Sequence, residues 1–238
     1  MKRGTKGMLI SFALTLSTAL VAFGTVWGTG GNAFLASAAT GTGGQGQRGG
    51  NPGNSSGRVL IAYFSMPETT APNNMSRAED DSTVVIDGKV LGNTQYVAHL
   101  IQENTGGDIF RIEPKTPYPT NHRTLVNLAQ KEQSDNARPE LAANIPNLDR
   151  YDVIFLGYPN WWADMPMILY SFLESVDLSG KTIIPFNTHG GNGFSDTIGT
   201  IAKLQPNAAV DKNGFTVFRD DVHKCADDVA AWLRKLGY

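Results

Sequence analysis

The chain of 238 residues has only one cysteine, Cys225, and no Asp or Glu before Arg58. A single cysteine allows no intramolecular disulfide, and it rules out zinc and iron–sulfur sites built on several cysteines. We expect Cys225 itself to be a small buried residue on a helix, which is how free cysteines usually behave. No internal repeat is visible.

The missing acidic residues make the charge uneven along the chain. Four of the 20 basic residues, but none of the 22 acidic ones, precede Arg58, so the formal net charge is −2 overall and −6 for residues 58–238. A mildly acidic domain is poorly suited to nucleic acid, which we therefore do not expect as a partner. The stretch 58–238 is long enough for one domain with its own core.

The N-terminal residues have the pattern of an export signal. Basic residues at the start precede an apolar run over 8–23 and the small residues Ala36, Ser37 and Ala38. We interpret residues 1–38 as a signal peptide cleaved after Ala38, which predicts an extracellular, periplasmic or cell-surface protein. The alternative is an uncleaved membrane anchor, because residues 8–27 are long enough to span a bilayer. The membrane would then be contacted only through this segment.

Residues 39–57 are rich in glycine and contain nothing to bury, so they are predicted to be a flexible linker. In the following domain, 58–238, five apolar runs have the character of strands, and helical patterns lie between them. The predicted strands are 59–64, 108–112, 152–158, 182–186 and 215–218. The predicted helices follow Thr94, Asn121, Pro166 and Asp196, and the last follows Asp220 and Asp221, which can cap it.

This alternation predicts an α/β fold with parallel strands, right-handed crossovers and helices on both faces of the sheet. Ligands of such sheets bind outside the carboxyl ends of the strands. The segments after the first, third and fourth strands are therefore the candidates for a functional site.

The segment after the first strand contains small polar residues. Ser65 follows that strand, and Gly92, Asn93 and Thr94 precede the next helix. Hydroxyl and amide side chains together with free N–H groups at a helix start can bind a phosphate without any cation. The alternative is ordinary helix capping by Asn93 or Thr94.

The segment after the third strand is Tyr158-Pro159-Asn160-Trp161-Trp162. Adjacent residues of an extended chain point in opposite directions, so both tryptophans cannot enter one core. At least one of them is expected to be exposed or to line a cleft, and a flat aromatic ligand would stack on it. The alternative places one tryptophan in the core and the other against a helix edge.

The segment after the fourth strand contains Thr188, His189, Gly190 and Gly191. Its glycines allow the backbone to approach a ligand closely and leave N–H groups for ring carbonyls. The alternative is a simple flexible turn. We expect His189 to contact the ligand rather than to act as a base, and we predict no catalytic residue and no metal site.

Five stretches of the chain resemble one known family, the flavodoxins, and the likeness covers residues 58–238. They are Leu60–Ser65, Gly92–Thr94, Gly157–Trp162 with Met165-Pro166, Ser179–Lys181 with Pro185-Phe186, and Thr188–Gly191 with Gly193-Phe194. The resemblance implies a flavodoxin-like three-layer sandwich around a five-stranded parallel sheet in the order 2-1-3-4-5, with bound FMN. The residues it places at the cofactor are Ser65, Gly92, Asn93, Thr94, Tyr158, Pro159, Asn160, Trp161, Trp162, Thr188, His189, Gly190 and Gly191.

The chain departs from the family pattern between Ser65 and Gly92, where residues 66–91 are inserted. Within the insertion, residues 84–90 are predicted to form a hairpin with an Asp-Gly turn, and 77–81 to be charged and exposed. The insertion leaves open whether the phosphate loop keeps its geometry, and it is a candidate lid or docking surface. Glu68 is expected to point away, because a carboxylate is unfavourable beside a phosphate.

The resemblance implies an FMN-binding electron carrier whose redox partner protein is unidentified. One alternative is an FMN-dependent reductase that takes hydride from NAD(P)H and reduces quinones or similar acceptors. Another is an extracellular binding module that keeps the fold and has lost FMN. The sequence favours the carrier, because FMN itself supplies the redox chemistry and no acid, base or nucleophile stands out.

Overall fold

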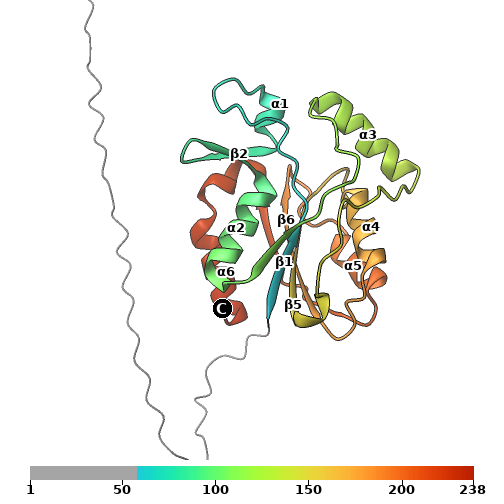
Figure 1. Cartoon of the computed structure of the whole chain (residues 1–238). Helices are drawn as coiled ribbons and strands as arrows, with labels where there is room; N and C mark the ends of the chain where they lie inside the picture. The colour runs from blue at the N-terminus through green and yellow to red at the C-terminus, as the bar shows by residue number, and fades with distance from the viewer. Residues whose placement is uncertain (1–57) are drawn as a thin grey trace, which may run out of the picture. The chain divides into compact units, whose positions relative to one another are not determined.

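The computed structural model describes residues 58–238, so the predicted signal peptide (1–38) and linker (39–57) lie outside the described residues. The domain is built around a parallel sheet whose carboxyl ends all lie at one edge (Figure 1). The strands of this sheet are β1 (Val59–Tyr63), β4 (Asp108–Arg111), β5 (Val153–Pro159), β6 (Thr182–His189), β7 (Ala209–Val210) and β8 (Phe215–Phe218).

The strand order is β4-β1-β5-β6, with β7 and β8 both paired to the outer side of β6. The predicted order 2-1-3-4-5 agrees in its first four positions, but two short strands share the fifth position, so the sheet has six strands and not five. β7 pairs with Thr182 and Ile183, and β8 pairs with β6 from Phe186 onward. Between them the chain leaves the sheet in a local turn, where the Asn213 N–H donates to Asp211 Oδ1 at 2.7 Å.

Helices cover both faces of the sheet, as predicted. They are α2 (Asn93–Thr105) and α6 (Ala226–Leu236) on one face, with α3 (His122–Ser134), α4 (Met167–Ser175) and α5 (Thr197–Leu204) on the other (Figure 1). Alternate residues of β1 enter the two cores, Leu60 and Ala62 on the α4 side and Ile61 and Tyr63 on the α2 side. All are buried, because a central strand is covered on both faces.

The start of the last helix differs from the prediction. Asp220 and Asp221 lie in a 3₁₀ helix, η2 (Arg219–Lys224), and do not cap α6, which begins at Ala226. Cys225 is buried, as expected, but it lies between the two helices and not on one. The apolar stripe that continues from Val222 to Leu233 therefore spans two helical segments that pack on the same core.

The insertion folds into a small unit of its own beside the sheet. It contains the one-turn helix α1 (Arg77–Asp80) and the antiparallel pair β2 (Thr83–Ile86) and β3 (Lys89–Gly92). The predicted Asp-Gly hairpin is confirmed: Asp87 and Gly88 have φ values of 50° and 75°, which a two-residue turn of this kind requires. A second 3₁₀ helix, η1 (Leu148–Arg150), precedes β5.

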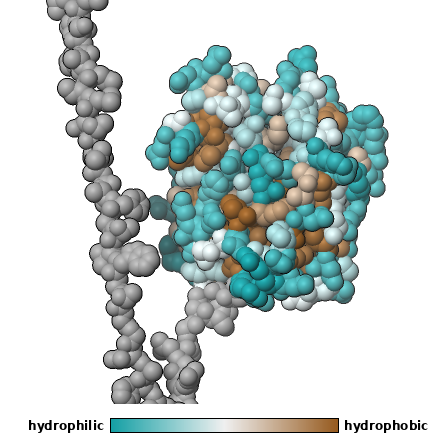
Figure 2. Space-filling view, viewed as in Figure 1, coloured by the Kyte–Doolittle hydropathy of each residue, from teal (hydrophilic) through white to brown (hydrophobic). Residues whose placement is uncertain are grey.

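The surface seen in Figure 2 is largely hydrophilic, with small groups of exposed hydrophobic residues. A notch at the top of this view separates the segment that carries α1 from the segment that carries α3. None of the helices in residues 58–238 is both long and apolar enough to cross a membrane.

Candidate functional site

A cavity of about 290 Å³ opens at the carboxyl ends of β1, β5 and β6, where α3 and the insertion border it. Its position is the one expected for the ligand of a parallel α/β sheet. Ten of the thirteen residues predicted at the cofactor line it. They are Ser65, Asn93, Thr94, Pro159, Asn160, Trp161, Trp162, Thr188, His189 and Gly190.

The other three predicted residues lie outside the cavity wall. Tyr158 is fully buried in the core and its hydroxyl bonds with Thr197 Oγ1 at 2.7 Å, because alternate residues of β5 face away from the cavity. Gly92 caps the start of α2 and packs against Ser65, and Gly191 follows the part of the loop that reaches the cavity.

The two tryptophans point in different directions because a tight turn follows β5. Trp161 and Asp164 exchange two backbone hydrogen bonds, at 2.9 and 3.0 Å, around Trp162 and Ala163, whose φ values are 54° and 63°. Left-handed backbone in two non-glycine residues costs of the order of 1 kcal/mol each. Contacts with α3 hold the turn: the Trp162 indole N–H donates to the Val126 carbonyl at 3.2 Å.

Trp161 faces the cavity, and its ring is fixed by aromatic neighbours. The rings of Phe64 and Tyr118 meet it edge-on, with centroids 5.4 and 5.8 Å away. Together with Pro159 it forms one wall, whereas Trp162 is 47% exposed at the rim. Both tryptophans line the cavity, Trp161 also packs against the core, and Trp162 bonds to α3. The prediction that at least one tryptophan is exposed or lines a cleft, and the alternative of one in the core and one against a helix, each describe part of this arrangement.

The facing wall comes from α3, which sequence reasoning did not place at the site. Leu125 and Val126 line the cavity from this helix, and Ala129 does so one turn further along. Asn121 fixes the start of the helix, because its side chain accepts the Thr124 N–H at 3.1 Å. The apolar periodicity of α3 was visible, but it could not tell a cavity wall from a core face.

The two parts of the predicted phosphate loop, Ser65 and the start of α2, lie in contact despite the insertion. Ser65 Oγ accepts the Gln95 N–H at 3.2 Å, and a Cβ at Gly92 would lie 2.1 Å from the same oxygen. The insertion thus leaves after Ser65 and returns beside it. It also uses the start of α2 for its own hydrogen bonds: the Asn93 N–H donates to the Ser82 carbonyl at 3.0 Å, and Asn93 Nδ2 donates to the Asp81 carbonyl at 3.1 Å.

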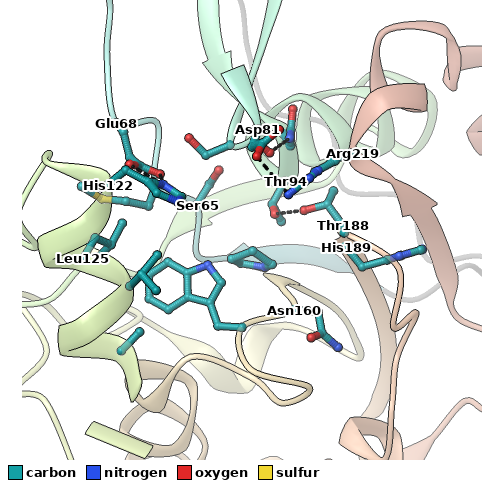
Figure 3. A pocket seen from close by; sticks show the side chains of 18 of the residues that line it. Ser65, Glu68, Asp81, Thr94, His122, Leu125, Asn160, Thr188, His189 and Arg219 are labelled. Atoms are coloured by element: carbon teal, nitrogen blue, oxygen red, sulfur yellow. Dashed lines mark hydrogen bonds and ion pairs between the residues drawn. The ribbon is translucent and has the colours of Figure 1, made fainter. Parts of the chain in front are cut away.

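The loop after β6 is tied to this region and to the turn after β5. The hydroxyls of Thr94 and Thr188 share a hydrogen bond of 2.9 Å (Figure 3), and Asn160 Nδ2 donates to the Gly193 carbonyl at 2.9 Å. His189 Nδ1 accepts the Gly191 N–H at 2.9 Å. Burial lowers the pKa of His189, which favours the neutral imidazole that this hydrogen bond requires.

Two pairs of ionisable side chains line the cavity, and the sequence did not reveal either of them. Glu68 is buried and accepts from His122 Nδ1, with both carboxylate oxygens within 3.1 Å (Figure 3). The expectation that Glu68 points away from the site is wrong, because its carboxylate has a hydrogen-bond partner within the cavity, His122 of α3. The second pair joins Arg219 of η2 to Asp81 of the insertion, with Nη1 3.3 Å from Oδ2.

The cavity therefore has an apolar end between Trp161 and α3 and a polar end between the insertion and η2. Within residues 58–238, no cluster of three or more His, Cys, Asp or Glu side chains could hold a metal ion. A flat aromatic ligand with a polar tail fits such an arrangement. The fold and the cavity together define the class of parallel α/β proteins that hold a ligand at the carboxyl ends of their strands.

The chain belongs to the flavodoxin family, because the family model described as flavodoxin matches residues 82–236. A protein from Bacteroides eggerthii, provisionally described as a flavoprotein, is 26% identical, with 76% of this chain and 98% of that one covered and a TM-score of 0.54. A counterpart from Bacteroides uniformis is 27% identical, with 75% and 98% covered and a TM-score of 0.53. No curated protein matches the chain.

Membership of the flavodoxin family confirms the predicted fold and agrees with FMN as the predicted cofactor. The residues present fit that group at both ends of the cavity. An aromatic and an apolar wall suit a flat ring, and hydroxyls with a guanidinium suit a phosphorylated tail. At the polar end, the buried Arg219 Nε–H donor has no hydrogen-bond partner within the described residues. An unpaired donor is expected where an anionic ligand completes the site.

Proposed function

We propose that this protein binds FMN in the cavity at the carboxyl ends of β1, β5 and β6 and carries electrons between protein partners. The observation that carries the proposal is the pairing of an aromatic wall, Trp161, with a polar end that holds Ser65, Thr94 and Arg219. When bound, FMN supplies the redox chemistry. The chain's own residues bind and orient the cofactor.

The test is a titration of the purified protein with FMN, followed by quenching of flavin fluorescence, with riboflavin as the matched control. Strong quenching by FMN and a much weaker response to riboflavin are expected, because only FMN has the phosphate. An equal response to both would mean that the ring is bound and the phosphate is not. A protein that responds to neither ligand would be a binding module on this fold, and the proposal would be abandoned.

A second candidate function is reduction of a small acceptor at the expense of NAD(P)H. The observation that favours it is the Glu68–His122 pair, which places a group able to hold a proton at the cavity. Oxidation of NAD(P)H by the FMN-loaded protein with a quinone, and no protein partner, would support the reductase. A failure to turn over under those conditions would favour the carrier.

The proposed place of action is outside the cytoplasm, and this part of the proposal rests on the sequence pattern of residues 1–38. N-terminal sequencing of the protein recovered from cells tests it. A mature chain that begins at Ala39 in the exported fraction is expected. An intact N-terminus in the membrane fraction would favour the anchor, and an intact chain in the cytoplasm would contradict export.

A further inference from the structure

The ion pair between Arg219 and Asp81 closes the polar end of the cavity. Arg219 is the first residue of η2, directly after β8, and Asp81 directly follows α1 of the insertion. Their side chains are 35% and 25% exposed, and both line the cavity (Figure 3). The pair therefore joins two segments that are more than a hundred residues apart in the sequence, at the place where a ligand's polar tail would lie.

The pair leaves much of the guanidinium's hydrogen-bonding capacity unused. An arginine has five N–H donors in a planar fork. The Arg219 Nε is buried without a hydrogen-bond partner in residues 58–238, and the nearest carboxylate on that side, Asp220, is 3.8 Å away. Gly190 allows the guanidinium to lie close to the loop after β6, since a Cβ there would be 3.2 Å from Nη1.

Most backbone N–H groups at the N-terminus of α2 are already used within the protein. The N–H groups of Asn93 and Gln95 already donate to Ser82 and Ser65. A dianion without strong donors or a cation nearby would be poorly solvated in this partly buried place. Arg219 is the cation that lines the cavity beside the hydroxyls of Thr94 and Thr188.

We propose that Arg219 binds the phosphate monoester of the ligand and that the Asp81 carboxylate is paired with the guanidinium when no ligand is bound. This inference rests on the proposed function, since it assigns the phosphate of FMN to Arg219. Guanidinium groups bind carboxylate and phosphate oxygens in the same bidentate geometry, so the two anions compete for one partner. The backbone of Asp81 stays tied to Asn93, and only its carboxylate has to turn away.

The competition gives the two partners opposite effects on affinity. Loss of Arg219 removes the phosphate's cation, whereas loss of the Asp81 charge removes its competitor and a like charge beside it. A merely structural ion pair would behave differently, because either substitution would then loosen the insertion in the same way.

The experiment measures the affinity of full-length variants for FMN and for riboflavin by fluorescence titration. R219M is expected to weaken FMN binding about tenfold or more, as loss of a charge-assisted hydrogen bond does, and to leave riboflavin nearly unchanged. D81N is expected to strengthen FMN binding by about threefold to tenfold, by relief of a like-charge contact. R150M is the matched control, because Arg150 pairs with Asp108 away from the cavity and its loss changes the net charge equally.

Equal losses of FMN and riboflavin affinity in R219M and D81N would overturn the inference in favour of a structural tether. If FMN binds and R219M leaves its affinity unchanged, the inference is wrong and the proposed function stands. If wild type binds neither flavin, the proposed function fails. In that case the Arg219 site is tested separately, by titrating the protein with inorganic phosphate and following the NMR resonance of the Arg219 Nε–H. A resonance shift that occurs at lower phosphate concentration in D81N supports the site, and the absence of any shift rejects it.

Discussion

The two ends of the cavity are held together by different kinds of contact. At the apolar end, Trp161 is fixed by ring contacts with Phe64 and Tyr118 and faces the aliphatic side chains of α3. At the polar end, ion pairs and hydrogen bonds from the insertion surround Asn93 and Arg219. Packing of this kind binds any flat ring of suitable size, whereas charge pairing can distinguish one ligand tail from another. Ring binding and phosphate selection are therefore separable in this protein.

The largest effect is expected at the apolar end. W161A removes the stacking surface, and loss of such a contact costs about 1–3 kcal/mol, or about fivefold to 150-fold in affinity. Because the ring is common to both ligands, FMN and riboflavin should lose affinity equally in the fluorescence titration. W162A should lower both affinities by less, because Trp162 is 47% exposed and supports the site through the turn that it ties to α3. A loss confined to FMN in W161A would contradict the separation of ring binding from phosphate selection.

The next effect concerns the pair that the insertion makes with α3. Glu68 is 5% exposed, and His122 is its hydrogen-bond partner within the described residues. H122A leaves a buried carboxylate unpaired, which should lower the free energy of unfolding by about 1–3 kcal/mol in urea. E68Q should recover part of that loss in the double variant, because an amide is less costly to bury unpaired than a charge. Strictly additive losses would show that the two side chains do not interact.

The smallest effect is expected from pH at the loop after β6. Burial lowers the pKa of His189, so the neutral ring that accepts the Gly191 N–H is favoured in the folded protein. The resulting stability is complete above the unfolded pKa of about 6.5, and it is lost as the pH falls through the lowered value. The free energy of unfolding should therefore fall modestly on acidification. An NMR titration of His189 should give a pKa below the ordinary range; a raised pKa would contradict the assignment.

Much of the fold could be predicted from local pattern. The uninterrupted apolar runs of β1 and β5 and the Asp87-Gly88 turn each specify their structure within a few residues. The split of the last strand could not be predicted. It depends on a turn at Asp211, and the short apolar pair Ala209-Val210 gives too little signal for a strand.

The candidate site was predictable where it follows directly from strand ends. Ser65, Pro159 and Thr188 each lie at the carboxyl end of a buried strand, and parallel strands bring those ends together. Glu68 and Arg219 were missed because each has a partner that is distant in sequence. Those contacts depend on the path of the insertion and on the position of α3 over the sheet. Neither produces a periodic pattern in the sequence.

The interrupted edge of the sheet has a consequence for how copies of this protein behave when crowded. One outer edge is formed by β4, four residues long with a charge at each end, and the other by β7 and β8 with a turn between them. A long, flat row of unpaired backbone groups would invite a strand from a neighbouring molecule to add to the sheet. Neither edge of this sheet presents such a row. We therefore expect no aggregation through strand addition in concentrated solutions, with or without bound cofactor.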